Sequence, residues 1–369
     1  MKRLLPLLVM LTVAAPCAAQ VTPAAGYTPP DDTPSIKVGV TIFADYTVQQ
    51  EPKITDTDGN SVTLNSFNVG RSYINITGNI SHSIAFRITP DISREGGTGS
   101  SLNGSYTFRL KYAFAQWNLD DYMTKGSWAR FGQQQTPYVD YAEGIYRYRF
   151  QGTVFVEREG YQSSADDGVS FHYNFAQNWG DLHGGVYDGE NYNKPELNDQ
   201  KGWQFRGTVR PLAHASTALR GLRITGFVDD DHYVKSADRF RGLFAVTYEH
   251  PYLNASYEYL STKDQTSVNK TEVDGKGWST WFTPKMPIAS KPGASLEGLL
   301  RWDHMEPNTS AATSNQTRSR FIGGIAYWFP HQGGVSTALL MDWDDAKFDN
   351  FTPALPEQKK FAIHCLVNF

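Results

Sequence analysis

Basic side chains recur at alternate positions in several segments of this 369-residue chain, on the parity opposite to the apolar residues. The set comprises Arg71, Arg87, Arg109, Lys111, Arg130, Arg206, Arg210, Arg223, Arg241, Arg301 and Arg320. An arginine guanidinium offers a planar fork that suits phosphate and carboxylate oxygens, whereas a lysine ammonium acts as a point charge. This pattern predicts a wall that attracts small anions.

Carboxylates on the same parity leave a second interpretation open. They are fewer than the basic residues and comprise Asp45, Asp91, Glu258, Glu297, Asp303 and Asp342. Because buried charges are usually paired, we expect about half of the arginines to brace the fold through ion pairs. The remainder would face an aqueous path.

The longest polar link, residues 137–167, carries a second group of candidate anion-binding residues. They are Arg147, Arg149, Arg158, Tyr146 and Tyr148, and they lie among Asp140, Glu143, Glu157 and Glu159. A long ordered loop is often functional, and a wide barrel needs a loop in its interior to form a constriction. We expect this segment to fold inward; the alternative is a surface loop with solvated charges.

No arrangement typical of an enzyme accompanies these residues. The nine histidines are scattered, without a serine and an acid at a recognisable spacing. His304 follows Asp303 and His232 follows an acidic run, but neither has an identifiable third metal ligand. We therefore expect no catalytic site, no metal and no cofactor.

Period-two alternation predicts the elements that position the basic wall. In the first segment Ile36, Val38, Val40 and Ile42 alternate with polar or small residues, which places one set on each face of a strand. Sixteen such segments follow one another, and their links alternate between short and long. This combination predicts an all-β fold, an antiparallel transmembrane barrel of 16 strands with short periplasmic turns and long extracellular loops. A soluble sandwich or propeller is the alternative.

The ends of the chain agree with an exported barrel. Residues 1–19 resemble a signal peptide, with Lys2 and Arg3 before an apolar run, and residues 20–35 form a Pro-rich leader. Acylation at Cys17 is a competing interpretation. Without residues 1–19 the charge is -6 and Cys365 is the single cysteine, which argues against nucleic-acid binding and excludes an internal disulfide. We expect the barrel to span residues 36–369.

Possible bulges qualify the assignment of faces. A bulge reverses the parity beyond it, and the pattern is least regular at Gly70, Phe227 and Trp281.

The last residue is a further feature typical of a barrel. The chain ends on Phe369, in an alternating strand, which resembles the signal that bacterial barrel-assembly machinery recognises.

Several stretches resemble the phosphate-selective porin O and P family of Gram-negative outer membranes. They are FNVGRSYINITGNISHSIAFRI, ARFGQQQTPY, GGVYDGENYN, LEGLLRWDHMEPN, RFIGGIAYWFPHQGG and ALLMDWD, within residues 36–369. The resemblance implies a trimeric barrel in outer-membrane lipid that passes small inorganic anions such as phosphate by diffusion. It implies a basic constriction to which Arg147 and Arg149 belong by position.

The acids of the long loop keep another function open. A general diffusion porin also sets acids against bases across its pore, so a non-specific porin is the main alternative. A barrel enzyme or a structural anchor is less favoured, and an active transporter would need a plug domain for which the leader is too short.

Overall fold

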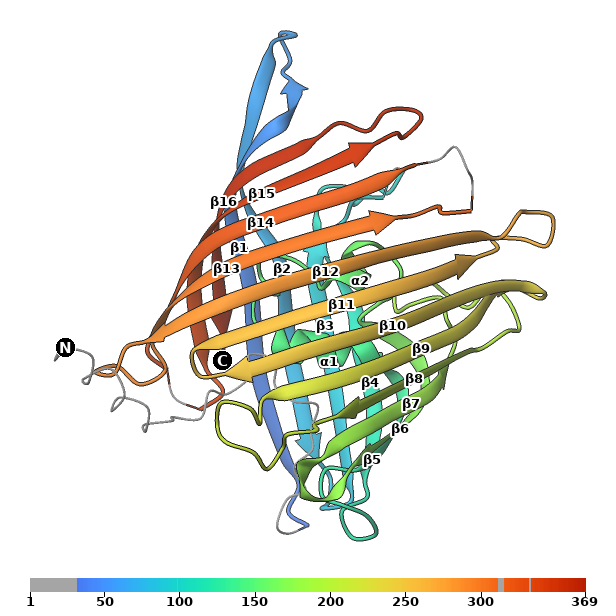
Figure 1. Ribbon diagram of the computed structural model, residues 1–369, viewed down its shortest axis with the longest axis vertical. Helices are drawn as coiled ribbons and strands as arrows, with labels where there is room; N and C mark the ends of the chain where they lie inside the picture. The colour runs from blue at the N-terminus through green and yellow to red at the C-terminus, as the bar shows by residue number, and fades with distance from the viewer. Residues whose placement is uncertain (1–31, 98, 311–314, 332) are drawn as a thin grey trace, which may run out of the picture.

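A computed structural model describes residues 32–97, 99–310, 315–331 and 333–369 of the protein. Within these ranges sixteen antiparallel strands form one closed barrel, in which each strand pairs with its sequence neighbours and β16 pairs with β1 (Figure 1). The strands are β1 (Ser35–Thr55), β2 (Ser61–Asn79), β3 (Ile84–Arg94), β4 (Tyr106–Asn118), β5 (Trp128–Gln135), β6 (Ala165–Asn174), β7 (Gly180–Tyr187), β8 (Gly202–Val209), β9 (Leu222–Val234), β10 (Ala237–His250), β11 (Leu253–Asp264), β12 (Val273–Pro287), β13 (Ser295–Glu306), β14 (Thr317–Trp328), β15 (Ser336–Asp349) and β16 (Gln358–Asn368). The predicted fold class is confirmed. The predicted signal peptide lies outside the described residues.

Alternate side chains point outward and carry the apolar surface that a lipid bilayer requires. Phe108, Phe131, Trp203 and Ile325 are each more than three-fifths exposed, while their strand neighbours face the interior. The closed ladder satisfies the backbone hydrogen-bonding groups of the strands.

The last strand closes the barrel against the first. Register pairs run from Thr41 with Asn368 to Glu51 with Lys359. Phe369 exchanges two backbone hydrogen bonds with Val40, of 2.9 and 3.0 Å. Beyond Glu51, β1 and β2 pair only with each other, so their hairpin rises above the rest of the rim (Figure 1).

Two bulges change the direction of side chains around the predicted basic wall. At the first, Phe43 pairs with Arg71 and Ala44 with Val69, which leaves Gly70 as the extra residue. The expected reversal at Gly70 is therefore present. No register shift occurs at the other two suspected positions, which are treated below with the loop that covers them.

The second bulge was not predicted. Pro90 pairs with Leu110 and Thr89 with Tyr112, so Lys111 and Tyr112 both turn inward. The sequence pattern assigns Tyr112 and Phe114 to the lipid face, and this is wrong, because both are 6% exposed inside the barrel. The alternation cannot reveal an extra residue when both possible faces accept an aromatic ring.

The long link between β5 and β6 forms two short helices inside the barrel, α1 (Pro137–Ile145) and α2 (Phe155–Arg158) (Figure 1). Pro137 occupies the first turn of α1, where a missing N–H costs nothing, and Asp140 lies near the positive end of the helix dipole. A 3-10 turn, η1 (Ala176–Asn178), joins β6 to β7. No helix among the described residues is long and apolar enough to span a membrane.

Candidate functional site

The loop between β5 and β6 packs against one half of the barrel wall and seals it. Its aromatic residues Tyr138, Tyr146, Tyr148 and Phe155 are at most 2% exposed. They belong to one apolar cluster with inward residues of β9 to β16, including Phe227, Leu243, Leu260, Trp281, Leu299, Ile322, Trp328 and Leu340. The expectation of a polar interior therefore fails in this half of the barrel.

This cluster also explains the irregular pattern at Phe227 and Trp281. The Phe227 ring lies 5.5 Å from that of Tyr138, and the Trp281 ring lies 5.3 Å from that of Tyr146. Both side chains keep the inward parity of their strands. An apolar residue can face the lumen here because the loop, rather than water, covers it.

Buried polar bonds fix the loop to the same half of the wall. Tyr138 donates its hydroxyl to Glu258 at 2.5 Å, and Arg301 donates to the Thr153 carbonyl at 2.9 Å. Tyr148 and Arg147 each donate to Glu297 at 2.9 Å. Since these partners lie on β11 and β13, the loop is held along its length.

This packing buries three of the five predicted constriction residues, Arg147, Tyr146 and Tyr148. Arg147 pairs with Glu297 and stacks over the Trp328 ring at 4.0 Å. Tyr146 and Tyr148 are 1% and 0% exposed. None of the three lines either of the two lumenal cavities described below.

Arg158 is similarly enclosed. It donates to Gln151 at 3.0 Å and lies 4.0 Å from Asp303. Burial, together with the nearby Arg301, lowers the pKa of Arg158 to about 10. The structure therefore gives this residue a role in shaping the loop.

Arg149 is the loop arginine that lines two lumenal cavities, although its side chain is only 11% exposed. It lines an outer cavity of about 390 Å³ and an inner cavity of about 70 Å³. Phe43 and Arg149 are the residues that both cavities share. Glu143 accepts a hydrogen bond from Arg149, and Glu157 lies 3.5 Å from it. Arg149 therefore marks the junction of the two spaces, flanked by carboxylates of its own loop.

The opposite wall, on β2 to β4, carries four of the predicted lumenal residues. Arg71 and Arg109 share the carboxylate of Asp91, at 2.5 and 3.8 Å. Arg87 donates to Asn75 at 2.9 Å and covers the Tyr112 ring at 4.5 Å. The carboxylate of Asp91 therefore lies within ion-pair distance of two guanidinium groups.

Lys111 is placed by the bulge in β4. Its ammonium lies 5.0 Å from the Tyr73 ring and 5.3 Å from the Tyr112 ring. Among the described residues no carboxylate lies within ion-pair distance of Lys111, Arg87 or Arg130. This is the part of the lumen where positive charge is least neutralised.

The remaining predicted basic residues are mostly paired. The pairs are Arg206 with Asp181, Arg223 with Glu249, Arg241 with Asp264, Arg301 with Asp303 and Arg320 with Asp344. Arg130 is fully buried over the Trp128 ring at 3.6 Å, and Arg210 donates to the Arg220 carbonyl at 3.2 Å. The arginines of β8 to β14 therefore act largely as braces, as the alternative interpretation expected.

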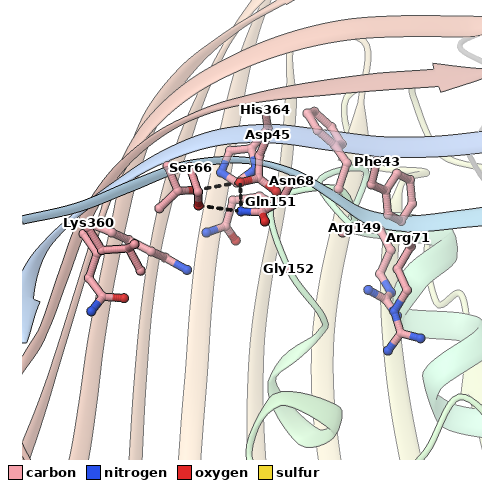
Figure 2. Close-up of a pocket in the computed structure, with 15 residues that line it drawn as sticks. Phe43, Asp45, Ser66, Asn68, Arg71, Arg149, Gln151, Gly152, Lys360 and His364 are labelled. Atoms are coloured by element: carbon pink, nitrogen blue, oxygen red, sulfur yellow. Dashed lines mark hydrogen bonds between the residues drawn. The ribbon is translucent and has the colours of Figure 1, made fainter. Parts of the chain in front are cut away.

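The linings of the two cavities hold more basic than acidic side chains, while Asp91, Glu157 and Asp344 pair with three of the basic residues from outside the linings. Their linings combine five basic residues, Arg71, Arg87, Lys111, Arg149 and Lys360, with two carboxylates, Asp45 and Glu143. Figure 2 shows the outer cavity, with Arg71 and Arg149 together at one end and Lys360 at the other. Lys360 was missed by the sequence analysis, although its inward parity on β16 could have indicated it.

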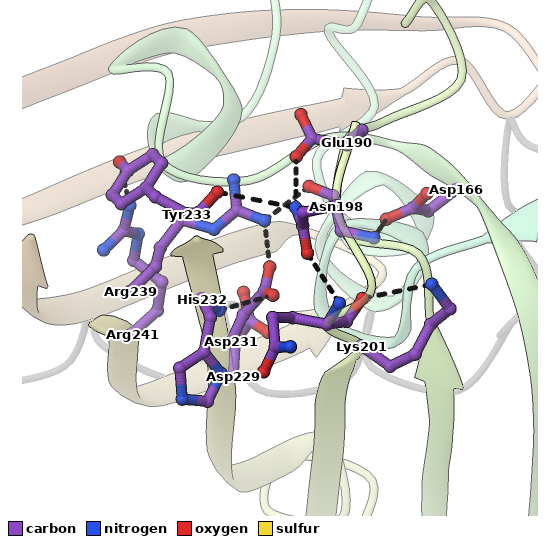
Figure 3. A network of polar contacts seen from close by, with 12 residues as sticks. Asp166, Glu190, Asn198, Lys201, Asp229, Asp231, His232, Tyr233, Arg239 and Arg241 are labelled. Carbon is purple, nitrogen blue, oxygen red and sulfur yellow. Dashed lines mark hydrogen bonds and ion pairs between the residues drawn. The ribbon is translucent and has the colours of Figure 1, made fainter. Parts of the chain in front are cut away.

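A separate polar network braces the mouth of the barrel. Asp231 pairs with Arg239, and Asp166 accepts from the Gly189 N–H at 3.0 Å (Figure 3). Asn198 donates to Glu190 at 3.2 Å and to the Tyr233 carbonyl at 3.4 Å. These contacts hold the loop between β7 and β8 against β9. No group of three metal-binding side chains occurs in the described part of the chain.

Comparison with solved structures finds the same architecture in outer-membrane channels. An anion-selective porin from Comamonas acidovorans superposes with a TM-score of 0.60 at 10% identity, over 91% of this chain and 100% of that one. OmpT of Vibrio cholerae gives 0.59 at 14% identity, over 93% and 100%. The channel DcaP of Acinetobacter baumannii gives 0.57 at 10% identity, over 91% and 97%. At such identities the likeness shows the fold.

The family follows from the sequence itself. No curated protein matches the chain. Residues 36–280 match the family model for phosphate-selective porin O and P. The match covers most of the barrel, including β2 to β5 and the loop between β5 and β6. The protein is thus a porin of the bacterial outer membrane, and the chain belongs to the phosphate-selective porin O and P family.

Proposed function

We propose that this porin passes small anions by passive diffusion, with phosphate and related oxyanions among them. The observation that carries the proposal is the surplus of basic over acidic side chains around the two cavities. A narrow aqueous path between low-dielectric walls focuses the field of its lining charges. Such a path lowers the barrier for anions and raises it for cations.

The inner cavity supports the choice of oxyanions. Arg87, Lys111 and Arg149 reach it from β3, β4 and the loop. Tyr73 and Tyr112 also line it, and Glu143 is its single carboxylate. Guanidinium forks suit oxyanion oxygens, and the aromatic rings keep the ammonium in place without neutralising it. The small volume favours an inorganic anion that has shed part of its water.

Measurements of ionic current through the purified protein test this proposal. The reversal potential of the purified protein in a planar bilayer, under a KCl gradient, reports anion preference. Saturable block of chloride current by inorganic phosphate reports a binding site. Lys111→Met keeps the size of the side chain and removes the charge, so we expect weaker block and a smaller reversal potential. Phosphate affinity unchanged in this variant would contradict a site in the inner cavity.

A general diffusion porin is the second candidate, and one observation favours it. Glu143 and Glu157 flank Arg149, so the loop side of the constriction is negative while the strand side is positive. A transverse arrangement of this kind reduces net selectivity. A reversal potential near zero without phosphate block supports this alternative.

We also propose that the protein assembles as a homotrimer. One structural neighbour, in-vitro folded OmpT of Vibrio cholerae, is a trimer form and gives a TM-score of 0.58 at 13% identity. Cross-linking in native outer membranes tests this: a ladder that stops at three copies is expected, and a single-copy band contradicts it.

A further inference from the structure

We propose that the outer cavity is a binding site for hydroxylated organic anions of the size of a hexose monophosphate. The proposal rests on the proposed anion channel and extends it from inorganic oxyanions to a second class of ligand. Three features of the outer cavity support this proposal. They are its size, the placement of charged and uncharged side chains along its lining, and its position on the extracellular side of the inner cavity.

The size of the cavity exceeds what an inorganic anion requires. Pockets for small organic ligands generally enclose about 300–1,000 Å³. The outer cavity, with about 390 Å³, falls within this range, whereas the inner cavity, with about 70 Å³, falls below it. A hexose monophosphate therefore fits the first space and is stopped before the second.

One end of the outer cavity provides the anion-binding groups. The guanidinium groups of Arg71 and Arg149 approach each other from β2 and from the loop (Figure 2). Each guanidinium has five N–H donors, so the pairing of Arg71 with Asp91, and of Arg149 with Glu143 and Glu157, leaves other donors for a phosphoryl group. Two forks from different elements can hold one phosphoryl group from two sides.

The middle of the cavity provides a band of neutral and hydrogen-bond-accepting groups. Thr47 donates to Asp45 at 2.7 Å, and Asn68 donates to Ser66 at 3.1 Å and to Asp45 at 3.4 Å. Gln151 of the loop lines the same cavity (Figure 2). Hydroxyls of a ligand can donate to the carboxylate and exchange bonds with the amides.

This band is poorly suited to inorganic phosphate. The Asp45 carboxylate repels an anion that lies beside it, but it accepts hydrogen bonds from neutral hydroxyls. Phe43 and Phe150 add apolar surface, against which the C–H face of a sugar ring can pack. Two guanidinium groups at one end and hydrogen-bonding groups, including the Asp45 carboxylate, in the middle thus match a ligand with one anionic end and a hydroxylated body.

The position of the cavity predicts a sided effect. Its lining includes Gln49 and Ser66, toward the long loops, whereas the inner cavity includes Thr41 and Asn368, toward the short turns. The outer cavity therefore opens toward the extracellular side. A ligand that binds there and does not pass the constriction blocks the current from that side.

The experiment is the block of chloride current in planar bilayers with channels of known orientation. Glucose 6-phosphate, inorganic phosphate and glucose are added separately to each side. We expect glucose 6-phosphate to block from the extracellular side at a concentration at least about fivefold lower than from the periplasmic side. Glucose is expected to block weakly. Equal block by glucose 6-phosphate and inorganic phosphate, or block without sidedness, overturns the proposal.

Variants separate the two ends of the site. Asn68→Ala removes a contact from the neutral band, so the affinity for glucose 6-phosphate should fall about fivefold, the effect of one hydrogen bond. Its affinity for inorganic phosphate should stay the same. Ser66→Ala is a second variant of the same band. Asn65→Ala is the matched control, because Asn65 lies on the same strand with the opposite parity and lines neither cavity.

The reversal potential in KCl alone distinguishes a failure of this inference from a failure of the proposed function. An anion-selective channel in which glucose 6-phosphate binds no better than phosphate retains the proposed function and loses the sugar-phosphate site. A channel without anion preference loses the proposed function itself.

Discussion

Arg147 and Arg149, two residues apart in the loop between β5 and β6, lie on opposite sides of that loop. Arg147 pairs with Glu297 at 2.9 Å in the sealed half of the barrel, whereas Arg149 lines both cavities in the open half. Their different surroundings, rather than their chemistry, decide which arginine lines the cavities.

Replacing these two arginines separately should give different phenotypes. Arg149→Ala removes a positive charge from the constriction, so the anion preference measured by the reversal potential should fall. Arg147→Ala should leave the reversal potential nearly unchanged. It should lower the stability of the loop by roughly 3 kcal/mol, because Glu297 keeps its charge without its basic partner. Thermal unfolding in detergent measures this loss. Equal effects of both variants on selectivity would falsify the assignment.

Neutralising the loop carboxylates should strengthen anion preference. Burial opposes ionisation of Glu157, but Arg149 and Lys111 hold its pKa below the usual value, so it is charged at neutral pH. Glu143→Gln and Glu157→Gln each remove a negative charge beside Arg149, and the reversal potential should shift toward that of an ideal anion channel. Glu159→Gln is the control, because Glu159 pairs with Arg318 and lines neither cavity. A shift toward cations would contradict this account.

Truncating the apolar seal should open the channel. Phe155 is fully buried, so Phe155→Ala should destabilise the packed loop by about 3–5 kcal/mol. The loop would then leave the wall more often, and single-channel recordings should show higher and noisier conductance. Phe131→Ala serves as the control, because that ring points toward lipid and is 65% exposed. Unchanged conductance in Phe155→Ala would mean that the other contacts hold the loop alone.

The attachment of the segment before β1 should depend on pH. His82, in the turn between β2 and β3, lies 2.5 Å from Asp32 and 2.9 Å from Asp121. Hydrogen bonding to Asp32, and then to Asp121, raises the pKa of His82 above 6.5. The bond to His82 lowers the pKa of Asp32 below 3.8.

The signs of these shifts set the pH window. Because the pKa of His82 is raised, protonated His82 stabilises the attachment fully below pH 6.5, and this stabilisation is lost as the pH rises through the folded-state pKa of His82. Because the pKa of Asp32 is lowered, ionised Asp32 stabilises the attachment fully above pH 3.8, and this stabilisation is lost as the pH falls through the folded-state pKa of Asp32. A fluorophore on Pro34→Cys, in a Cys365→Ser background, should therefore report release above pH 6.5. His82→Gln is the control variant, in which the fluorophore should report the same degree of release at low and high pH. A pH-dependent signal in this variant would assign the effect to another group.

Sequence periodicity was sufficient to predict the barrel because lipid imposes a strict rule on alternate residues. Segments such as Ile36–Ile42, which face lipid on one side, reveal both the strand and its outward face. The rule fails where a bulge inserts one residue, as at Lys111, or where a ring can suit either face, as with Tyr112 and Phe114. Gly70 could be suspected because the alternation itself breaks there.

The candidate site was predictable only in part. The sequence by itself determined the sixteen strands, the long loop and the supply of inward basic residues, since these depend on local pattern and on the demands of lipid. Only the tertiary structure decided which of those residues face water. That choice depends on which strands the loop covers: it buries Arg147 and Tyr148 against β13 and β14, and it leaves Lys111 and Arg149 in the lining of the inner cavity. Contacts between segments some 150 residues apart have no local pattern, so no periodicity could indicate them.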